Sequence, residues 1–273
     1  MHSFPTLCCS IASHPSPSGQ AVHNALYEKL GLPFRYVAFG VHADPGSIVN
    51  AIRTLGIRGA GITMPYKETL LPYLDEIDED ASQIGAINTL VNENGCIKGY
   101  NVDWLGAMRA LEHQGIDVSG QKVVLVGAGG AARAIAFGLK KKGAQLIGIY
   151  NRTESRSQTL ATDLELPFGG NLSNIPSQYD LLVHATSAGH LSQPQQCVIP
   201  DHAIVPKRII FDVVPEPKNT PLLQLARKKD CKIIYGYSMR MHQAAAQFEL
   251  YTGETAPLEL MESLFLKQLE PPS

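Results

Sequence analysis

A glycine-rich stretch near the middle of the chain has the residue types and the spacing that hold a phosphate group. The apolar run Val123–Val126 is followed by Gly127, Gly129 and the small residue Ala132. In this pattern the first glycine permits a tight turn, the second lets backbone approach a pyrophosphate, and the third residue brings a helix close to the sheet. The N-terminus of that helix offers free N–H groups and a partial positive charge. The stretch therefore predicts a dinucleotide-binding strand, turn and helix, with a purely structural turn as the alternative.

The end of the next strand-like run, Gln145–Tyr150, indicates which dinucleotide is bound. NAD sites usually carry Asp or Glu about 20 residues beyond the glycines, where the carboxylate accepts from the ribose 2′-hydroxyl. The residue at that place is Asn151, and Arg152, Thr153 and Arg156 follow it. Two guanidinium groups and a hydroxyl suit a 2′-phosphate. The tip therefore favours NADP over NAD, with an ordinary solvated basic turn as the alternative.

Composition limits the class of protein. A chain of 273 residues with 44% hydrophobic and 18% charged residues has enough apolar surface for two domains with their own cores. The net charge of −2 gives no sign of nucleic-acid binding. No apolar stretch approaches the length of a membrane span, and residues 1–10 lack the features of a signal peptide.

The cysteines and histidines point away from disulfides and metals. The five cysteines contain no C-x-x-C pair, and their odd number suits free thiols in a reducing cytoplasm. The nine histidines form no H-x-x-x-H motif and no cluster with cysteine, so we expect no metal site.

Strand-like and helix-like segments alternate along the chain, which predicts an α/β fold. In the first half, we expect strands at 7–11, 34–39, 59–63, 86–91 and 97–100, and helices at 23–30, 47–55, 66–74 and 81–84. In the second half, a helix at 104–113 ends before Gly115, which we take as the domain hinge, and further strands are expected near 122–127, 145–150, 180–184, 208–213 and 231–235. A last helix at 239–251 has no strand partner and is expected to cross back to the first domain.

Four motifs occur in a fixed order along the chain. They are ITMPYK at 62–67, AINTL at 86–90, GYNVD at 99–103 and QAAAQFELYTG at 243–253. The pair His23-Asn24, the glycine turn and the Asn151–Thr153 tip accompany them. Together these stretches cover nearly the whole length and resemble the shikimate dehydrogenase family.

The resemblance implies a two-domain α/β protein. It implies an N-terminal α/β substrate domain at 1–103, completed by a C-terminal helix returning at 236–273, and a Rossmann-type NADP-binding domain at 104–235. It also implies a cytoplasmic, NADP-dependent oxidoreductase that interconverts 3-dehydroshikimate and shikimate, in the pathway of aromatic amino acid biosynthesis. The expected partner is a small cyclic hydroxy acid, with no nucleic acid or membrane, and the expected assembly is a monomer or homodimer.

The oxidation of a secondary alcohol moves hydride to the nicotinamide and needs a base for the hydroxyl proton. Lys67 and Asp103 resemble the catalytic pair of the family, in which the carboxylate orients the ammonium. Taken alone, Lys67 is typical of a solvated surface lysine and Asp103 of a helix N-cap.

The other site residues also follow from the resemblance. The substrate-binding residues are expected to be Ser16, Ser18, Thr63, Asn88 and Gln243. The cofactor-binding residues are expected to be Gly127, Ala128, Gly129, Gly130, Ala131, Asn151, Arg152, Thr153, Arg156, Thr186 and Gly236. Hydroxyl and amide groups suit a polyol ring because they supply donors and acceptors without charge.

The chain departs from the usual pattern of the family at several positions. Gly19 follows Ser18 in place of proline, Val102 stands where threonine is common, and His184 replaces the usual asparagine before Ala185-Thr186. His190 replaces a usual methionine, and Val214 stands where tyrosine is frequent. These departures indicate a divergent branch and bear on substrate preference and turnover.

Two other functions remain open at this point. A quinate or aminoshikimate dehydrogenase would share the fold, although the arginine-rich tip argues against an NAD-preferring quinate enzyme. A non-catalytic NADPH-binding sensor would also share it, although a sensor has no need of both Lys67 and Asp103. A turnover assay separates the enzymes from the sensor.

Overall fold

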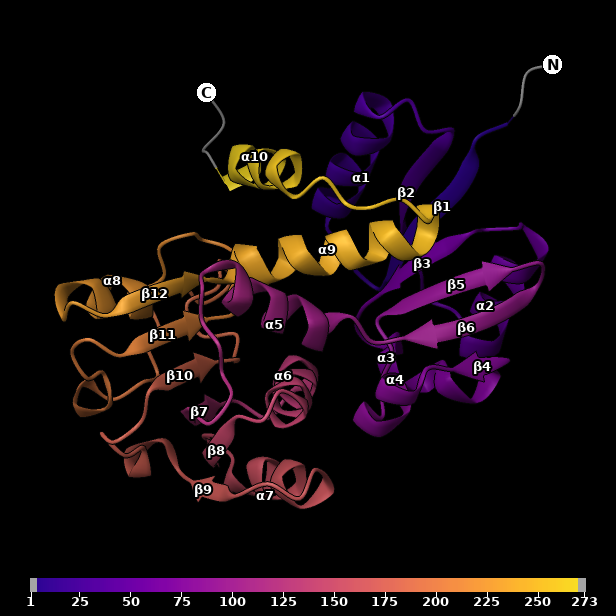
Figure 1. The fold of residues 1–273 in the computed structure, drawn as a ribbon. Helices are drawn as coiled ribbons and strands as arrows, with labels where there is room; N and C mark the ends of the chain where they lie inside the picture. Colours follow the sequence, from indigo (N-terminus) through magenta and orange to yellow (C-terminus); the bar gives the residue numbers. More distant parts are fainter. Residues whose placement is uncertain (1–3, 270–273) are drawn as a thin grey trace. The chain divides into compact units, whose positions relative to one another are not determined.

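The computed structural model describes residues 4–269, and the chain divides into two compact units (Figure 1). The first unit runs to Val102 and resumes at Gln243, and the second unit is Asp103–His242. The return to the first unit therefore occurs inside one helix, α9 (Gly236–Thr252). The expected domain boundaries, at residues 103 and 236, stay predictions.

The first unit contains a six-stranded mixed sheet with the strand order β2-β1-β3-β5-β6-β4. Its strands are β1 (Thr6–Ala12), β2 (Phe34–Gly40), β3 (Gly59–Ile62), β4 (Glu76–Ile77), β5 (Thr89–Glu93) and β6 (Cys96–Tyr100). Strands β2, β1 and β3 are parallel, and β5 is antiparallel to β3 and β6. The β5–β6 hairpin turns at Asn94-Gly95, where both residues have positive φ, as a tight two-residue turn requires.

Helices cover both faces of this sheet. They are α1 (Pro17–Lys29), α2 (Pro45–Thr54), α3 (Tyr66–Thr69), α4 (Glu79–Ile84) and α10 (Leu258–Leu269), with a 3₁₀ turn at Leu71–Tyr73. Helices α2, α3 and α4 pack their apolar side chains with those of β1 and β3. On the other face, the Tyr251 ring of α9 fills the space where a side chain at Gly59 would stand. Helix α10 lies beside α1 (Figure 1).

The second unit contains a six-stranded sheet that is parallel throughout, with the order β12-β11-β10-β7-β8-β9. Its strands are β7 (Lys122–Val126), β8 (Gln145–Tyr150), β9 (Phe168–Gly170), β10 (Leu181–His184), β11 (Ile209–Asp212) and β12 (Lys232–Tyr235). Its other helices are α5 (Asp103–His113), α6 (Gly130–Lys141), α7 (Glu154–Asp163) and α8 (Pro221–Lys228), with 3₁₀ turns at Leu172–Asn174 and Asp201–Ala203.

Two cores sandwich the parallel sheet. Helices α5, α6 and α7 cover one face, and α8 covers the opposite face (Figure 1). Strand order reverses at β7, which has β10 on one side and β8 on the other. In sheets of this kind ligands bind beyond the carboxyl ends of the strands at such a reversal. The loops after β7, β8 and β10 therefore share the edge where a nucleotide is expected.

The predicted α/β fold is confirmed, and several local predictions are corrected. Gly115 is not a hinge, because α5 belongs to the second unit and packs in the same core as α6. Helix α1 begins at Pro17, well before the expected start at 23, because Ser16 caps it and proline suits the first turn. The expected helix at 66–74 divides into α3 and a 3₁₀ turn, since Pro72 cannot donate a helical hydrogen bond.

Within residues 4–269, no helix has the length and apolar character needed to cross a bilayer.

Candidate active site

The two serines of the N-terminal loop lie at the start of α1. The Ser16 hydroxyl caps the helix by accepting from the Ser18 backbone N–H at 3.3 Å. The Ser18 hydroxyl donates to the side-chain oxygen of Gln268 on α10, and the Gln268 amide donates back to the Ser18 carbonyl at 3.3 Å. A helix N-terminus with a hydroxyl suits a carboxylate. Ser18, however, already has a partner on the C-terminal helix.

Lys67 is positioned by the backbone of α3. The Tyr66 ring is buried and its hydroxyl donates to the Val41 carbonyl at 2.9 Å. The carbonyl of Lys67 accepts from the Ile87 N–H at 2.8 Å, which ties α3 to the chain entering β5. The Lys67 side chain is half-buried, and Thr63, at the end of β3, is exposed. Lys67 and Thr63 thus lie at the carboxyl end of β3.

Asn88 is fully buried, and its hydrogen bonds fix the direction of its amide. Its Oδ1 accepts from the Val102 backbone N–H at 2.8 Å and from the Thr89 hydroxyl at 2.9 Å. Because a backbone N–H can only donate, the oxygen must face Val102 and the NH₂ group must point the other way. That Nδ2 atom is buried and has no hydrogen-bond partner. A buried unpaired donor costs about 1–3 kcal/mol, so it marks a position where a ligand oxygen would be favoured.

Gln247 extends this network and was missed from the sequence. Its Nε2 donates to the Thr89 hydroxyl at 3.0 Å and to the Asn88 carbonyl at 3.4 Å. The predicted ligand Gln243 is half-buried one helical turn earlier, on the same face of α9. The spacing of four residues between two glutamines in one helix was the signal available in the sequence.

Asp103 is the first residue of α5 and the first residue of the second unit. Asp103 is buried, with 4% of its surface exposed. The chain that leads into it is held by two amides, since Asn88 binds Val102 and the Asn101 side chain donates to the Ala86 carbonyl at 3.0 Å. Lys67 belongs to the first unit, so the pairing of Lys67 with Asp103 stays a prediction.

The glycine turn has the geometry that a nucleotide loop requires. Gly127 has φ +124°, and a Cβ there would stand 2.5 Å from the Ala185 carbonyl oxygen. Gly129 and Gly130 are exposed, and a Cβ on either would meet open space. Helix α6 begins at Gly130, so its first N–H groups have no partner within the helix. The turn therefore offers room and donors to a pyrophosphate.

A cavity of about 320 Å³ lies between the glycine turn and α7. It is lined by Ala128, Arg133, Ser155, Arg156, Thr159 and Leu160. Arg133 forms an ion pair with Asp163 of α7. Of the predicted residues, Ala128 and Arg156 line this cavity, whereas Arg152 and Thr153 are exposed on the turn before α7.

Asn151 shapes that turn through its amide, which donates to the Thr153 carbonyl at 2.9 Å. Arg133, Ser155 and Thr159 were not expected, because only tertiary packing brings α6 and α7 together around the cavity. Two arginines and two hydroxyls suit the 2′-phosphate end of NADP.

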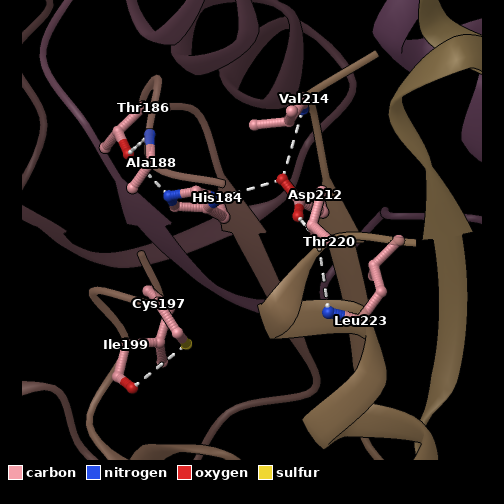
Figure 2. Close-up of polar contacts among 9 residues, drawn as sticks. All are labelled: His184, Thr186, Ala188, Cys197, Ile199, Asp212, Val214, Thr220 and Leu223. Carbon is pink, nitrogen blue, oxygen red and sulfur yellow. Dashed lines mark hydrogen bonds and ion pairs between the residues drawn. The ribbon is translucent and has the colours of Figure 1, made fainter. Parts of the chain in front are cut away.

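A buried polar network lies next to the loop that follows β10 (Figure 2). His184 Nδ1 lies 2.9 Å from Asp212 Oδ1, and His184 Nε2 lies 2.6 Å from the hydroxyl of Thr186. His184 is 2% exposed and Asp212 is fully buried.

The predicted residue Gly236 packs its backbone against the Val214 carbonyl, which explains the glycine there without a ligand. Its role in cofactor binding stays a prediction.

The second unit, with its parallel doubly wound sheet, glycine turn and cavity, and the first unit, with its buried amides, define a two-domain dinucleotide-binding α/β protein. Family models match three segments: the shikimate dehydrogenase substrate binding domain at 11–90, shikimate / quinate 5-dehydrogenase at 109–219, and the shikimate 5′-dehydrogenase C-terminal domain at 236–264. The chain belongs to the shikimate dehydrogenase family.

Individual relatives agree with this assignment. Shikimate dehydrogenase (NADP(+)) of Moorella thermoacetica is 38% identical over 88% of this chain and 85% of its own length. A shikimate dehydrogenase-like protein of Haemophilus influenzae is 36% identical over 93% of each chain. The crystal structure of shikimate 5-dehydrogenase from Thermus thermophilus in complex with NADP(H) and shikimate has a TM-score of 0.86, 33% identity, and coverage of 96% of this chain and 99% of that one.

Proposed function

We propose that the protein is an NADP-dependent oxidoreductase that interconverts 3-dehydroshikimate and shikimate. The observation that carries this proposal is the buried Asn88 Nδ2, a donor with a fixed direction and no partner. A ring bearing several hydroxyl groups supplies the oxygens that such a donor needs. Relatives named shikimate dehydrogenase (NADP(+)) and a solved relative with NADP(H) and shikimate bound support the choice of substrate and cofactor.

The nucleotide site fits NADP by its own geometry. The turn at Gly127 leaves no room for a side chain, Gly129 and Gly130 face open space, and Arg156 lines a cavity beside them. Bound NADP supplies a nicotinamide that accepts the hydride from the alcohol carbon. The glycine turn binds the pyrophosphate, and Arg156 with its neighbours on the turn after β8 binds the 2′-phosphate.

Each residue proposed to act on the substrate has one task. Lys67 takes the hydroxyl proton as general base, and Asp103 orients its ammonium. Asn88 and Gln243 hold ring hydroxyls, and Thr63 adds a hydroxyl at the end of β3. Ser16 at the N-terminus of α1 holds the carboxylate, and Ser18 joins it by exchanging Gln268 for the substrate.

The test is a turnover panel with shikimate, quinate and related cyclic acids, each with NADP⁺ and with NAD⁺. We expect shikimate with NADP⁺ to give the highest kcat/KM. A preference for quinate would assign the other dehydrogenase activity, and NADPH binding without turnover of any acid would assign a sensor. Lys67→Ala serves as the matched negative control, because it removes the base and leaves the nucleotide unit unchanged.

We also propose a cytoplasmic location and a monomer or homodimer. The five cysteines are all free thiols, and two of them are buried in β1, which suits a reducing compartment. Cell fractionation tests the location, and light scattering of the purified protein tests the assembly. A stable tetramer would contradict the second expectation.

A further inference from the structure

The hydrogen bonds around Asp212 fix which atom of His184 carries a proton. The Thr220 hydroxyl donates to Asp212 Oδ2, and the Val214 N–H donates to Oδ1 at 3.2 Å. Both carboxylate oxygens therefore act as acceptors, so His184 Nδ1, 2.9 Å from Oδ1, must supply the hydrogen of that contact (Figure 2). In the neutral ring the other nitrogen, Nε2, is then an acceptor.

The direction of this chain passes on to Thr186. With the His184 ring neutral, Nε2 accepts, so the Thr186 hydroxyl donates its hydrogen across the 2.6 Å contact. The same hydroxyl oxygen accepts from the Ala188 N–H at 3.2 Å. With its hydrogen committed to His184, the Thr186 oxygen can present only an acceptor lone pair to a ligand.

The place of Thr186 in the sheet identifies what it faces. Thr186 follows β10, and its methyl group would lie 3.3 Å from a Cβ built on Gly127 of the nucleotide turn. Strands β10 and β8 flank β7 on opposite sides, and the arginine-lined cavity lies on the β8 side. A dinucleotide extends across this reversal of strand order, so its adenosine end on the β8 side places its nicotinamide half toward β10.

We propose that His184 is a positioning residue for the cofactor. Held by Asp212, it takes the hydrogen of the Thr186 hydroxyl and so presents the Thr186 oxygen as an acceptor to donors on the nicotinamide half of NADP, its ribose hydroxyls and carboxamide N–H groups. This inference rests on the proposed NADP binding.

The key variant is His184→Asn. The asparagine NH₂ can occupy the place of Nδ1 and keep a donor on Asp212, but no atom then reaches Thr186. We expect the variant to bind NADP⁺ about ten-fold more weakly, the worth of one hydrogen bond, and to bind adenosine 2′,5′-bisphosphate like the parent. His184→Gln brings an amide oxygen toward the place of Nε2 and should restore NADP⁺ affinity to within about two-fold. Calorimetry gives both affinities, and thermal unfolding checks that each variant is folded.

A double-mutant cycle with Thr186→Val shows whether His184 acts through Thr186. We expect the double variant to bind NADP⁺ no more weakly than Thr186→Val alone, because the hydroxyl that His184 directs is already gone. His202→Ala, at an exposed histidine of the same unit, should bind both ligands like the parent. Additive losses, equal losses for both ligands, or parent-like NADP⁺ binding by His184→Asn would overturn the proposal. If His184→Asn does not fold, the comparison of His184→Gln with Thr186→Val decides by the same criteria. Binding is measured without a substrate, so failure of the shikimate assay leaves this test intact.

Discussion

We predict that His23 makes the stability of the first unit depend on pH. It lies in α1, is 1% exposed, and stacks on the Tyr36 ring with centroids 4.5 Å apart. Its Nδ1 is buried and has no hydrogen-bond partner. Burial lowers the pKa of His23 from 6.5 to about 4, because the charged ring would lose its hydration.

The sign and size of the effect follow from this pKa. As the pH falls below 6.5, the unfolded chain binds a proton at His23 that the folded chain does not yet bind, so stability is lost between pH 6.5 and about 4. A shift of this size corresponds to about 3 kcal/mol in full, of which about 2 kcal/mol is already lost at pH 5. That is a large part of the roughly 5–15 kcal/mol that stabilises a typical domain.

The assay is urea unfolding, followed by circular dichroism, of the parent and His23→Phe at about pH 7 and about pH 5. Phenylalanine keeps a ring on Tyr36 and cannot ionise. We expect the loss of unfolding free energy between the two pH values to be smaller in His23→Phe by about 2 kcal/mol. His14→Asn, at an exposed histidine of the same unit, should behave like the parent. An equal loss in the parent and in His23→Phe would refute the reasoning.

Three further predictions concern the site. Arg156→Ala should weaken NADP⁺ binding about ten-fold or more and leave NAD⁺ binding unchanged in calorimetry, because it removes a charge-assisted bond to the 2′-phosphate; equal losses for both would contradict this role. Lys67→Ala should lower kcat by about 10²–10⁴-fold with unchanged NADP⁺ affinity, and full activity would remove Lys67 from the mechanism. Gln247→Met keeps the volume but releases Thr89 and Asn88, so it should raise KM for the acid several-fold, about the worth of one hydrogen bond, and leave KM for NADP⁺ unchanged; a change in the KM for NADP⁺ alone would exclude a role on the substrate side.

Local sequence rules predicted the elements that carry their own signals. The run Val123–Val126 is fully buried as β7, and Gly127 makes the turn expected of it. The Asn94-Gly95 turn closes the predicted hairpin. These features depend on residues adjacent in sequence, so propensity and turn chemistry specify them. Helix α10 was missed, although it buries Met261 and Phe265 and lies beside α1, because the helical period of its apolar residues was not recognised.

What the sequence alone determined is the fold class, the nucleotide turn and the family, since each rests on residue types at short, fixed spacings. Tertiary structure decided which polar groups meet. Gln247 lies 158 positions from Thr89, and Asp212 lies 28 positions from His184. Strand pairing and helix packing bring these groups within hydrogen-bond distance, and no local pattern encodes such a contact. The direction of the Asn88 amide is set by Val102, and that of the Thr186 hydroxyl by His184, which Asp212 holds from another strand. Only the folded chain therefore shows which donor and which acceptor each site offers.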